Sequence, residues 1–265
     1  MRIARFTTGD DPRFALVQQE GDRTFLAVLG GDPLSMPAMP TGERVELGDG
    51  VRLLAPVIPR SKIVAVGKNY ADHAKEMGAA VDRGNPVFFM KPADAAVPGG
   101  GLLPYPRGTS DLHHEVELVV ALGRDADGVV PVDGAPALVF GYAVGLDLTR
   151  RDLQARAKAG GLPWDTGKGF DRSAPVSEVV PADMAGALGP RRLWLEVNGE
   201  LRQQATLDQM VFTVAEIIHE LSKLYDLRAG DLIFTGTPAG VAALQPGDRF
   251  RAGLDDLIEL QGGIA

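Results

Sequence analysis

Glycine and proline interrupt this sequence so often that long regular elements are not expected. The chain has 33 glycines and 19 prolines, about a fifth of its 265 residues. Because both residue types end helices and mark turns, their density favours many short strands over long helices. The proportion stays below the roughly 25–30% that is typical of low-complexity chains. A chain of this length buries about three quarters of its unfolded surface, which is enough for one large core.

Composition excludes several classes of protein. The sequence has no cysteine, which excludes disulfide scaffolds, thiolate metal sites and cysteine nucleophiles. The first ten residues lack the apolar stretch of a signal peptide, and no apolar run approaches the roughly 18 residues of a membrane span. The formal charge is −8 and no cluster of Lys and Arg is present, which argues against nucleic acid as a partner. We therefore expect a cytoplasmic enzyme or binding protein, with neither nucleic acid nor a membrane as its partner.

The first fifty-odd residues predict a small β domain. Apolar residues 14–17 and 24–28 flank the polar Gly21-Asp22 corner, which is the pattern of a β-hairpin with a longer loop. The segment 53–62 then contains two prolines and is expected to join this part to the main body. We therefore divide the chain into an N-terminal β domain, residues 1–57, and a larger domain, residues 58–265.

The larger domain is expected to contain mostly strands. Residues 62–66 and 86–90 are short apolar runs, and residues 115–122 alternate with the period of a strand. Residues 193–204 predict a hairpin, because their central Asn198-Gly199 readily adopts the positive φ angles of a type I′ turn. Strands and helices do not alternate as they do in a doubly wound sheet. The predicted fold class is α+β, mainly β.

Three helices are expected. Residues 71–78 predict a short helix that ends at Gly78. The spacing of Thr213 and Glu216 is that of a capping box, and apolar residues follow at helical spacing as far as Leu224. Residues 150–159 predict another helix, with Thr149 as its N-cap and two glycines as its stop.

Three carboxylates are candidate metal ligands. On a strand, Glu115 and Glu117 point to the same face with Cα atoms roughly 6.5 Å apart. An isolated Glu-x-Glu pair is more often a solvated outer face. Asp147 follows an apolar run, at a position where sites are often built, and shifts the balance towards a site. Three carboxylates without a thiolate form a hard oxygen set, which suits Mg²⁺, Mn²⁺ or Ca²⁺ better than Zn²⁺.

A histidine and a lysine are candidate catalytic residues. His73 and Glu76 are three positions apart on a predicted helix, so the carboxylate can orient the imidazole as a general base. A surface ion pair is the simpler interpretation of that spacing. Lys168 lies in a glycine-flexed loop and can neutralise an anion, although exposed loop lysines are common. The surrounding glycines do not have the spacing of a phosphate-binding loop.

Further polar positions are candidate substrate contacts. Arg151 and Gln154 share one face of the predicted helix after Asp147, which is either a solvated face or a wall of the same site. Gly236 and Thr237 follow an apolar run, and their backbone N–H groups and hydroxyls can hold a carboxylate, although an ordinary tight turn has the same pattern. Lys91 ends another apolar run and can face a ligand, although a lysine in that place is usually solvated.

The order of these segments resembles the fumarylacetoacetate hydrolase family, particularly its acylpyruvate and fumarylpyruvate hydrolase branch. The resemblance begins near Ser61 and continues to the C-terminus. The segments that carry it are residues 67–76, 114–117, 141–154, 168–171, 197–200 and 235–238. Lys68 departs from the arginine that close relatives often have, keeping the charge but losing the planar guanidinium.

The resemblance implies a fold, a site and a partner. It implies a mixed β-roll catalytic domain that is usually dimeric, with Mg²⁺ as the first choice of metal. The metal ligands would be Glu115, Glu117 and Asp147. The residues that would act in catalysis are His73, Glu76, Lys168 and Gln154, and those that would contact substrate are Gly236, Thr237, Arg151 and Lys91.

The implied activity is hydrolysis of a C–C bond in 2,4-dioxo acids, which gives pyruvate and a carboxylic acid. His73, oriented by Glu76, would activate water, Gln154 would stabilise the oxyanion, and Lys168 would stabilise the pyruvate enolate. Decarboxylation of oxaloacetate, isomerisation of 2-hydroxyhepta-2,4-diene-1,7-dioate and hydration of a 2-oxo-enoic acid are alternatives that use the same enolate chemistry. A non-catalytic module with a structural Ca²⁺ is an alternative of another class.

Overall fold

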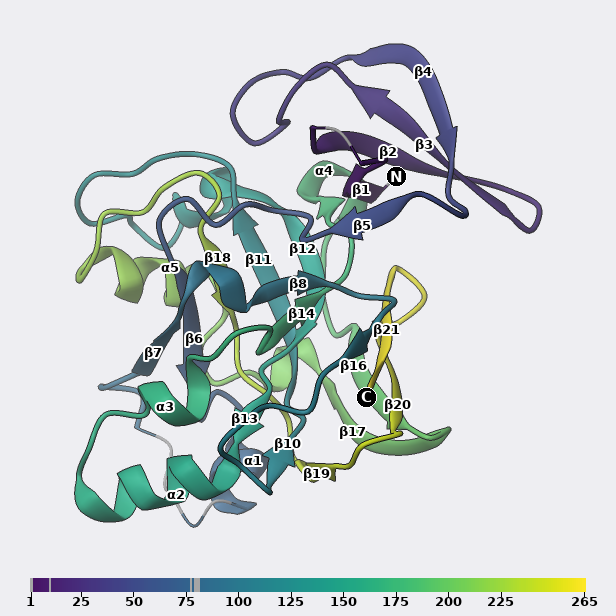
Figure 1. Cartoon of the computed structure of the whole chain (residues 1–265). Helices are drawn as coiled ribbons and strands as arrows, with labels where there is room; N and C mark the ends of the chain where they lie inside the picture. The colour runs from purple at the N-terminus through teal and green to yellow at the C-terminus, as the bar shows by residue number, and fades with distance from the viewer. Residues whose placement is uncertain (1, 10, 77, 79–81) are drawn as a thin grey trace.

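The computed structural model describes residues 2–9, 11–76, 78 and 82–265, and β-strands are the most abundant regular element among them (Figure 1). The described part confirms the α+β, mainly β fold class. Its α-helices are short: α1 (Ala71–Glu76), α2 (Arg151–Gly160), α3 (Asp165–Lys168), α4 (Ala182–Ala185) and α5 (Val214–Ser222). Met77, within the helix predicted over 71–78, lies outside the described residues. None of the described helices is long and apolar enough to cross a membrane.

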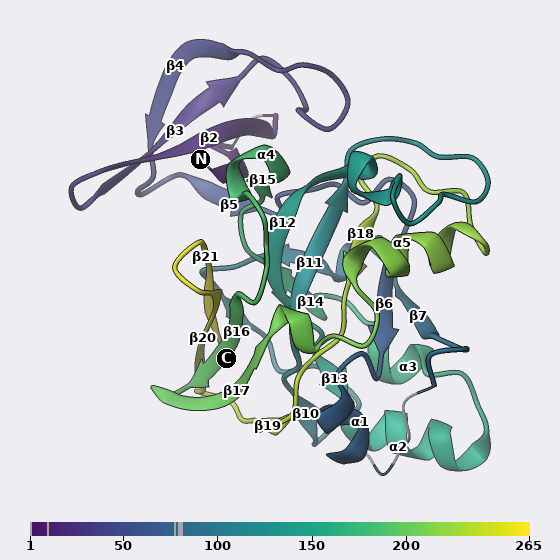
Figure 2. The same cartoon turned by 180° about the vertical axis from the view of Figure 1, so that it is seen from behind.

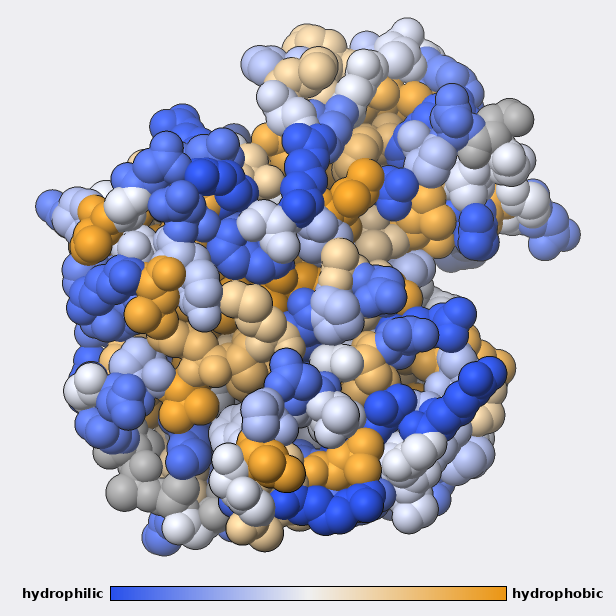
Figure 3. Space-filling view, turned by 60° about the vertical axis from the view of Figure 1, so that its left-hand side comes forward, coloured by the Kyte–Doolittle hydropathy of each residue, from blue (hydrophilic) through white to orange (hydrophobic). Residues whose placement is uncertain are grey.

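The N-terminal residues form a five-stranded sheet in the order β4-β3-β2-β1-β5. Every neighbouring pair is antiparallel, and β2 with β3 is the predicted hairpin. The sheet stands above the rest of the molecule in both views (Figures 1 and 2), and the surface is indented where the two parts meet (Figure 3). Its strands are β1 (Arg2–Thr7), β2 (Arg13–Glu20), β3 (Arg23–Leu29), β4 (Pro40–Glu46) and β5 (Arg52–Leu54).

An eight-stranded sheet forms the centre of the molecule. Its order is β7-β6-β18-β11-β12-β14-β8, and β15 pairs with β12 outside this path. The predicted strands over 62–66, 86–90 and 115–122 are confirmed as β6, β7 and β11. The strands are β6 (Ile63–Gly67), β7 (Val87–Lys91), β8 (Ala96–Pro98), β11 (Val116–Leu122), β12 (Val139–Leu146), β14 (Ala174–Val176), β15 (Val180–Pro181) and β18 (Leu232–Phe234).

Strand β11 is buried on both faces. Val120 and Leu122 pack with α5, whereas Val119 and Ala121 point the other way and pack with Phe234 of β18. A strand that is covered on both sides offers no solvated face, so any charged side chain on it must find partners inside the protein. The interpretation of Glu115 and Glu117 as a solvated face is therefore wrong.

Two further sheets complete the body. One has the order β17-β16-β20-β21-β9 and includes the predicted hairpin, with φ of 53° at Asn198 and 80° at Gly199. The other has the order β13-β10-β19. The strands are β9 (Leu102–Leu103), β10 (Leu112–His113), β13 (Thr149–Arg150), β16 (Arg192–Val197), β17 (Glu200–Thr206), β19 (Ala243–Leu244), β20 (Arg249–Leu254) and β21 (Ile258–Ile264).

The helix boundaries differ from the predictions at two places. Thr213 caps α5 as predicted, but the helix ends at Ser222, and Leu224 is 60% exposed rather than packed. Helix α2 has Arg150 as its N-cap with no side-chain hydrogen bond, because Thr149 is held in β13. The strand pairing of Thr149 therefore overrides the capping pattern that the local sequence predicts.

The described core predicts that replacing Phe234 strongly destabilises the protein. The side chain of Phe234 is fully buried between β6, β11 and β12. Phe234→Ala should lower the free energy of unfolding by about 3–5 kcal/mol, because it removes buried apolar area and leaves a cavity. Chemical denaturation monitored by circular dichroism measures this loss. Met39→Ala, at a side chain that is 75% exposed, is the matched control and should change stability by less than about 0.5 kcal/mol. Equal effects in the two variants would contradict this core assignment.

Candidate active site

The three predicted metal ligands meet at the ends of two paired strands. In the antiparallel pair β11 and β12, Val116 lies opposite Leu146, and the Asp147 N–H donates to the Glu115 carbonyl at 2.8 Å. This register places Asp147 beside Glu115, and the strand period of two places Glu117 on the same side. One oxygen from each carboxylate lies within 4.8 Å of the others. All three side chains are buried.

Lysine and arginine side chains compensate two of the three carboxylates. Lys168, which ends α3 rather than lying in the predicted loop, donates to Glu115 at 2.7 Å, to Asp147 at 2.5 Å and to Thr149 at 2.7 Å. Arg151 donates to Glu115 at 2.6 Å. Burial alone would raise the pKa of Glu115, but the positive charges of Lys168 and Arg151 outweigh it and hold that pKa well below its usual range.

Glu117 is the carboxylate that lacks a cationic partner. Among the described residues, no lysine, arginine or histidine nitrogen is paired with it, and the Gly236 N–H donates to it at 2.6 Å. Burial and the negative charges of Asp147 and Glu115 raise the pKa of Glu117 well above its usual range. A divalent cation among the three carboxylates would supply the missing charge, and a hard oxygen set suits such an ion. The residues present therefore fit a divalent metal.

His73 and Glu76 also lie together, as predicted. Both belong to α1, and the Nδ1 atom of His73 is 3.4 Å from a carboxylate oxygen of Glu76. The Gly240 N–H also donates to Glu76, at 3.1 Å, which gives the carboxylate a second partner. Because the imidazole is buried, the pKa of His73 is lowered from its usual value, so the ring is neutral at pH 7 and can accept a proton.

A small pocket of about 30 Å³ opens onto this group of residues. Seven predicted site residues line it: His73, Glu115, Glu117, Arg151, Gln154, Lys168 and Thr237. The sequence analysis assigned no site role to the other six: Val66, Gly67, Lys68, Phe89, Lys158 and Trp164. Gly67 and Lys68 belong to a segment that carries the family resemblance, whereas no signal in the sequence marks the other four, which come from separate elements that the fold brings to the pocket. Asp147, Glu76, Lys91 and Gly236 lie around this pocket without lining it.

Two predicted substrate contacts take other partners. Lys91 lies behind the carboxylates: its ammonium is 2.7 Å from Asp147 and donates to the carbonyls of Leu148, Lys168 and Ser173. Because this ammonium is enclosed by protein groups, it cannot reach a ligand in the pocket. The Gly236 N–H is likewise committed to Glu117. The structure thus corrects both predictions, and both residues support the carboxylates.

Gln203 of β17 connects the carboxylate strand to the turn that carries Thr237. Its amide oxygen accepts from the Val116 N–H at 3.1 Å, and its amide nitrogen donates to the Thr237 hydroxyl at 2.8 Å. The Nδ1 atom of His114 also lies 2.9 Å from the amide oxygen of Gln203. The sequence analysis missed Gln203, because nothing in a single polar residue on a hairpin strand shows that it is buried.

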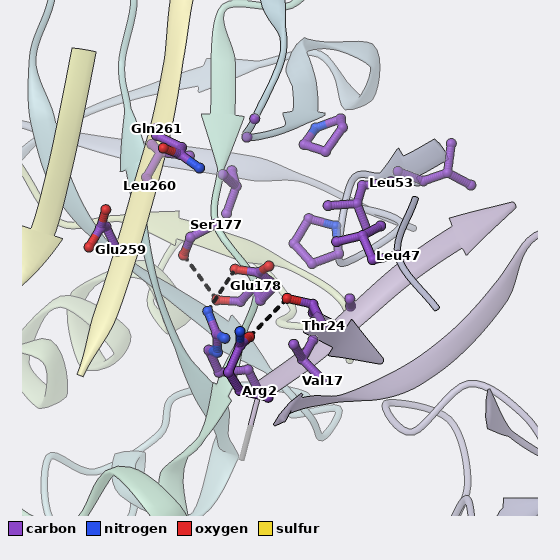
Figure 4. A pocket seen from close by; sticks show the side chains of 18 residues that line it. Arg2, Val17, Thr24, Leu47, Leu53, Ser177, Glu178, Glu259, Leu260 and Gln261 are labelled. Carbon is purple, nitrogen blue, oxygen red and sulfur yellow. Dashed lines mark hydrogen bonds and ion pairs between the residues drawn. The ribbon is translucent and has the colours of Figure 1, made fainter. Parts of the chain in front are cut away.

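A larger cavity of about 510 Å³ lies between the N-terminal sheet and the ends of β14 and β21 (Figure 4). Its polar side chains interact with each other: Arg2 lies 3.8 Å from Glu178, and the Thr24 hydroxyl donates to Gln19. The carboxylate cluster does not line it. The smaller pocket is therefore the candidate active site.

The cluster predicts that Glu117→Gln removes metal binding without weakening the fold. The variant should lose about 100-fold or more in Mn²⁺ affinity, because it removes a charged ligand from the set. In metal-free buffer it should melt no lower than the parent, because it removes a buried carboxylate that its neighbours repel. Titration calorimetry and thermal melts measure the two effects. Glu76→Gln, outside the cluster, should retain Mn²⁺ affinity; unchanged Mn²⁺ binding in Glu117→Gln would contradict the metal assignment.

Comparisons with known proteins agree with this geometry. Residues 62–265 match the family model described as fumarylacetoacetate (FAA) hydrolase C-terminal, and residues 1–56 match a model described as Rv2993c-like, N-terminal. The chain is 46% identical to a mitochondrial oxaloacetate tautomerase of Rattus norvegicus, over 75% of this chain and 89% of the relative. It is 41% identical to a mitochondrial oxaloacetate decarboxylase of Dictyostelium discoideum, over 74% and 89%.

Solved structures are similar over most or all of the chain. A fumarylpyruvate hydrolase from Pseudomonas aeruginosa, in complex with Mn²⁺ and pyruvate, has a TM-score of 0.74 and 44% identity and covers 83% of this chain and 93% of that one. A 2-hydroxyhepta-2,4-diene-1,7-dioate isomerase from Mycobacterium marinum has a TM-score of 0.85 and 32% identity, over 100% and 98%. With the fold and the carboxylate cluster, these matches establish that the chain is a metal-dependent enzyme of the fumarylacetoacetate hydrolase family.

Proposed function

We propose that this enzyme hydrolyses a C–C bond of 2,4-dioxo acids such as fumarylpyruvate, giving pyruvate and a carboxylic acid. The observation that carries the proposal is the His73–Glu76 pair on the same pocket as the carboxylate cluster. Hydrolysis needs a base that activates water, in addition to groups that stabilise an enolate. The similarity to the Pseudomonas aeruginosa fumarylpyruvate hydrolase, which was solved with Mn²⁺ and pyruvate bound, supports this choice.

A divalent cation held by Glu115, Glu117 and Asp147, Mg²⁺ first and Mn²⁺ or Ca²⁺ as alternatives, would act as a Lewis acid towards the oxygens of the 2-oxo acid. His73 takes a proton from water through Nε2, because the Glu76 carboxylate holds the proton on Nδ1. The hydroxide bonds to C4 and the C3–C4 bond breaks. Its electron pair forms the pyruvate enolate, and C3 takes up the proton from His73.

The remaining pocket residues stabilise the charges that develop. Gln154, whose amide oxygen accepts from Arg151 at 2.6 Å, can donate through its NH₂ group to the oxyanion at C4. Lys168, which lines the pocket and holds Glu115 and Asp147, would stabilise the enolate through its positive charge. Thr237 can bind the substrate carboxylate through its hydroxyl, which Gln203 positions, and Arg151 can contribute its guanidinium to the same carboxylate.

Oxaloacetate chemistry is a second candidate, favoured by the relatives of this chain. The curated relatives named above are an oxaloacetate tautomerase and an oxaloacetate decarboxylase. Neither reaction incorporates water into a carboxylic acid. The test is to supply acetylpyruvate, fumarylpyruvate and oxaloacetate in ¹⁸O-water with Mg²⁺. Hydrolysis is supported if the acylpyruvates give pyruvate together with a carboxylic acid that contains ¹⁸O. It is overturned if the acylpyruvates do not react and oxaloacetate alone reacts, by CO₂ release or enol–keto exchange.

Three further expectations remain proposals. We propose that the protein acts in the cytoplasm, as a homodimer, on a small-molecule 2-oxo acid. The curated relatives have mitochondrial in their names, which describes those proteins. The mean mass in solution, measured by light scattering, tests the dimer.

Replacing the proposed base separates hydrolysis from metal binding. His73→Ala should lower kcat for acylpyruvate hydrolysis by about 10²- to 10⁴-fold, because water then lacks its base. Mn²⁺ affinity should stay within about twofold. His219→Gln is the matched control, since His219 pairs with the Val130 carbonyl away from the pocket, and it should keep full activity. An unchanged hydrolytic rate in His73→Ala would reduce the His73–Glu76 pair to a structural contact.

The pKa of His73 sets the acid limb of the pH profile. A base acts only in its neutral form, and burial lowers this pKa below the ordinary 6.5. With Mn²⁺ kept saturating, kcat/KM should therefore stay level from pH 8 down to about 6.5 and fall only at lower pH. A fall that begins between pH 8 and 7, or no fall at all in the acid range, would count against His73 as the base.

A further inference from the structure

The cations of the pocket wall fall into two groups. Four described lysine and arginine residues line the pocket: Lys68, Arg151, Lys158 and Lys168. Arg151 and Lys168 are paired with Glu115. No aspartate or glutamate oxygen of the described residues is within ion-pair distance of Lys68 or Lys158. The pocket wall therefore has two positive charges, at Lys68 and Lys158, for which the described part of the chain supplies no anion.

Lys158 is held at this wall by an aromatic contact. Its ammonium lies 4.9 Å from the centre of the Trp164 ring, on the segment between α2 and α3. Trp164 in turn packs on Phe89 with ring centres 6.0 Å apart, and the Lys168 ammonium lies 4.9 Å from the Phe89 ring. The Phe89 ring thus lies beside the Lys168 ammonium, which is paired with the carboxylates. The neighbouring Trp164 ring lies beside the Lys158 ammonium, which has no ionic partner among the described residues. A cation over an aromatic face keeps its charge available to a ligand.

Electrostatic effects agree with an uncompensated cation. Burial, followed by the repulsion of Arg151 and Lys168, lowers the pKa of Lys158 to about 8. Lys68 reinforces the charge from the turn after β6, where its backbone has a φ of 62°. A non-glycine residue in this left-handed conformation is held there by its surroundings.

We propose that Lys158, seated on Trp164, and Lys68 form an anion site that selects 2-oxo acids with a second carboxylate at the end away from the 2-oxo group. This inference rests on the proposed function, because it assumes that the 2-oxo acid end lies at the Glu115, Glu117 and Asp147 cluster. The inner cations serve that end. The outer lysines then contact the far carboxylate, so the preferred substrates are dianionic rather than simple acylpyruvates.

The kinetic test compares two substrates that differ at the far end. Lys158→Gln should raise KM for fumarylpyruvate, which has the second carboxylate, by about tenfold and leave kcat within twofold. KM for acetylpyruvate, which lacks that carboxylate, should not change. Lys68→Gln should act in the same direction, and Lys158→Arg should restore the fumarylpyruvate KM. Arg156→Gln is the matched control, because Arg156 is an exposed cation of the same helix that does not line the pocket.

A binding test keeps this inference separable from the proposed function. In the presence of Mn²⁺, titration calorimetry compares 2-oxoglutarate with 2-oxopentanoate, five-carbon 2-oxo acids that differ in the far carboxylate. Lys158→Gln should weaken 2-oxoglutarate about tenfold and 2-oxopentanoate not at all. If neither acylpyruvate is hydrolysed but this selective loss is found, the proposed hydrolysis fails and the anion site stands. Equal losses of affinity for both ligands, or no loss for either, overturn the proposed anion site, whether or not the acylpyruvates are hydrolysed.

Discussion

Three carboxyl groups enclosed in the interior are the constraint on which this structure depends. At 4 Å, two like charges repel by about 4 kcal/mol even at an effective dielectric constant of 20, and the oxygens of Glu115, Glu117 and Asp147 are gathered within 4.8 Å. Lys168 and Arg151 offset part of this repulsion, and Lys91 offsets more from behind. Glu117 has no cationic partner among the described residues, and this is why the cluster fits a divalent cation.

The rest of the fold holds this cluster in place and gives it a pocket. The segment after β12 is short, yet it supplies Arg151, Gln154, Lys158 and Lys168 from two small helices that lie side by side near β7 (Figure 1). The turn after β18 supplies Thr237, and Gln203 ties that turn to β11. Lys91 and Gly236 hold the carboxylates from outside the pocket lining. Arg151 and Lys168 hold them from the pocket wall, which also carries Lys68 and Lys158.

Much of the site could be predicted from the sequence, because the order of its segments resembles a known family; taken singly, the spacing of His73 and Glu76 favoured a surface pair. Glu115, Glu117 and Asp147 were predicted as a hard oxygen set, and His73 with Glu76 as an oriented base; the structure brings each group together. Lys91 and Gly236 were predicted to contact substrate, and both contact the carboxylates instead. The error has one cause: a residue type at a strand end shows what it can bind, whereas the neighbours that reach it first depend on the packing.

The sequence by itself determined the local features of this protein. The strand period of residues 115–122, the turn at Asn198-Gly199 and the cap at Thr213 follow from interactions among residues close in the chain, so a short stretch of sequence specifies them. The tertiary structure alone decided that residue 115 lies beside residue 147, that Lys168 reaches both, and that Lys158 lies on Trp164 with no ionic partner among the described residues. These outcomes depend on strand register and on burial, and both arise only when segments distant in the sequence share one interior.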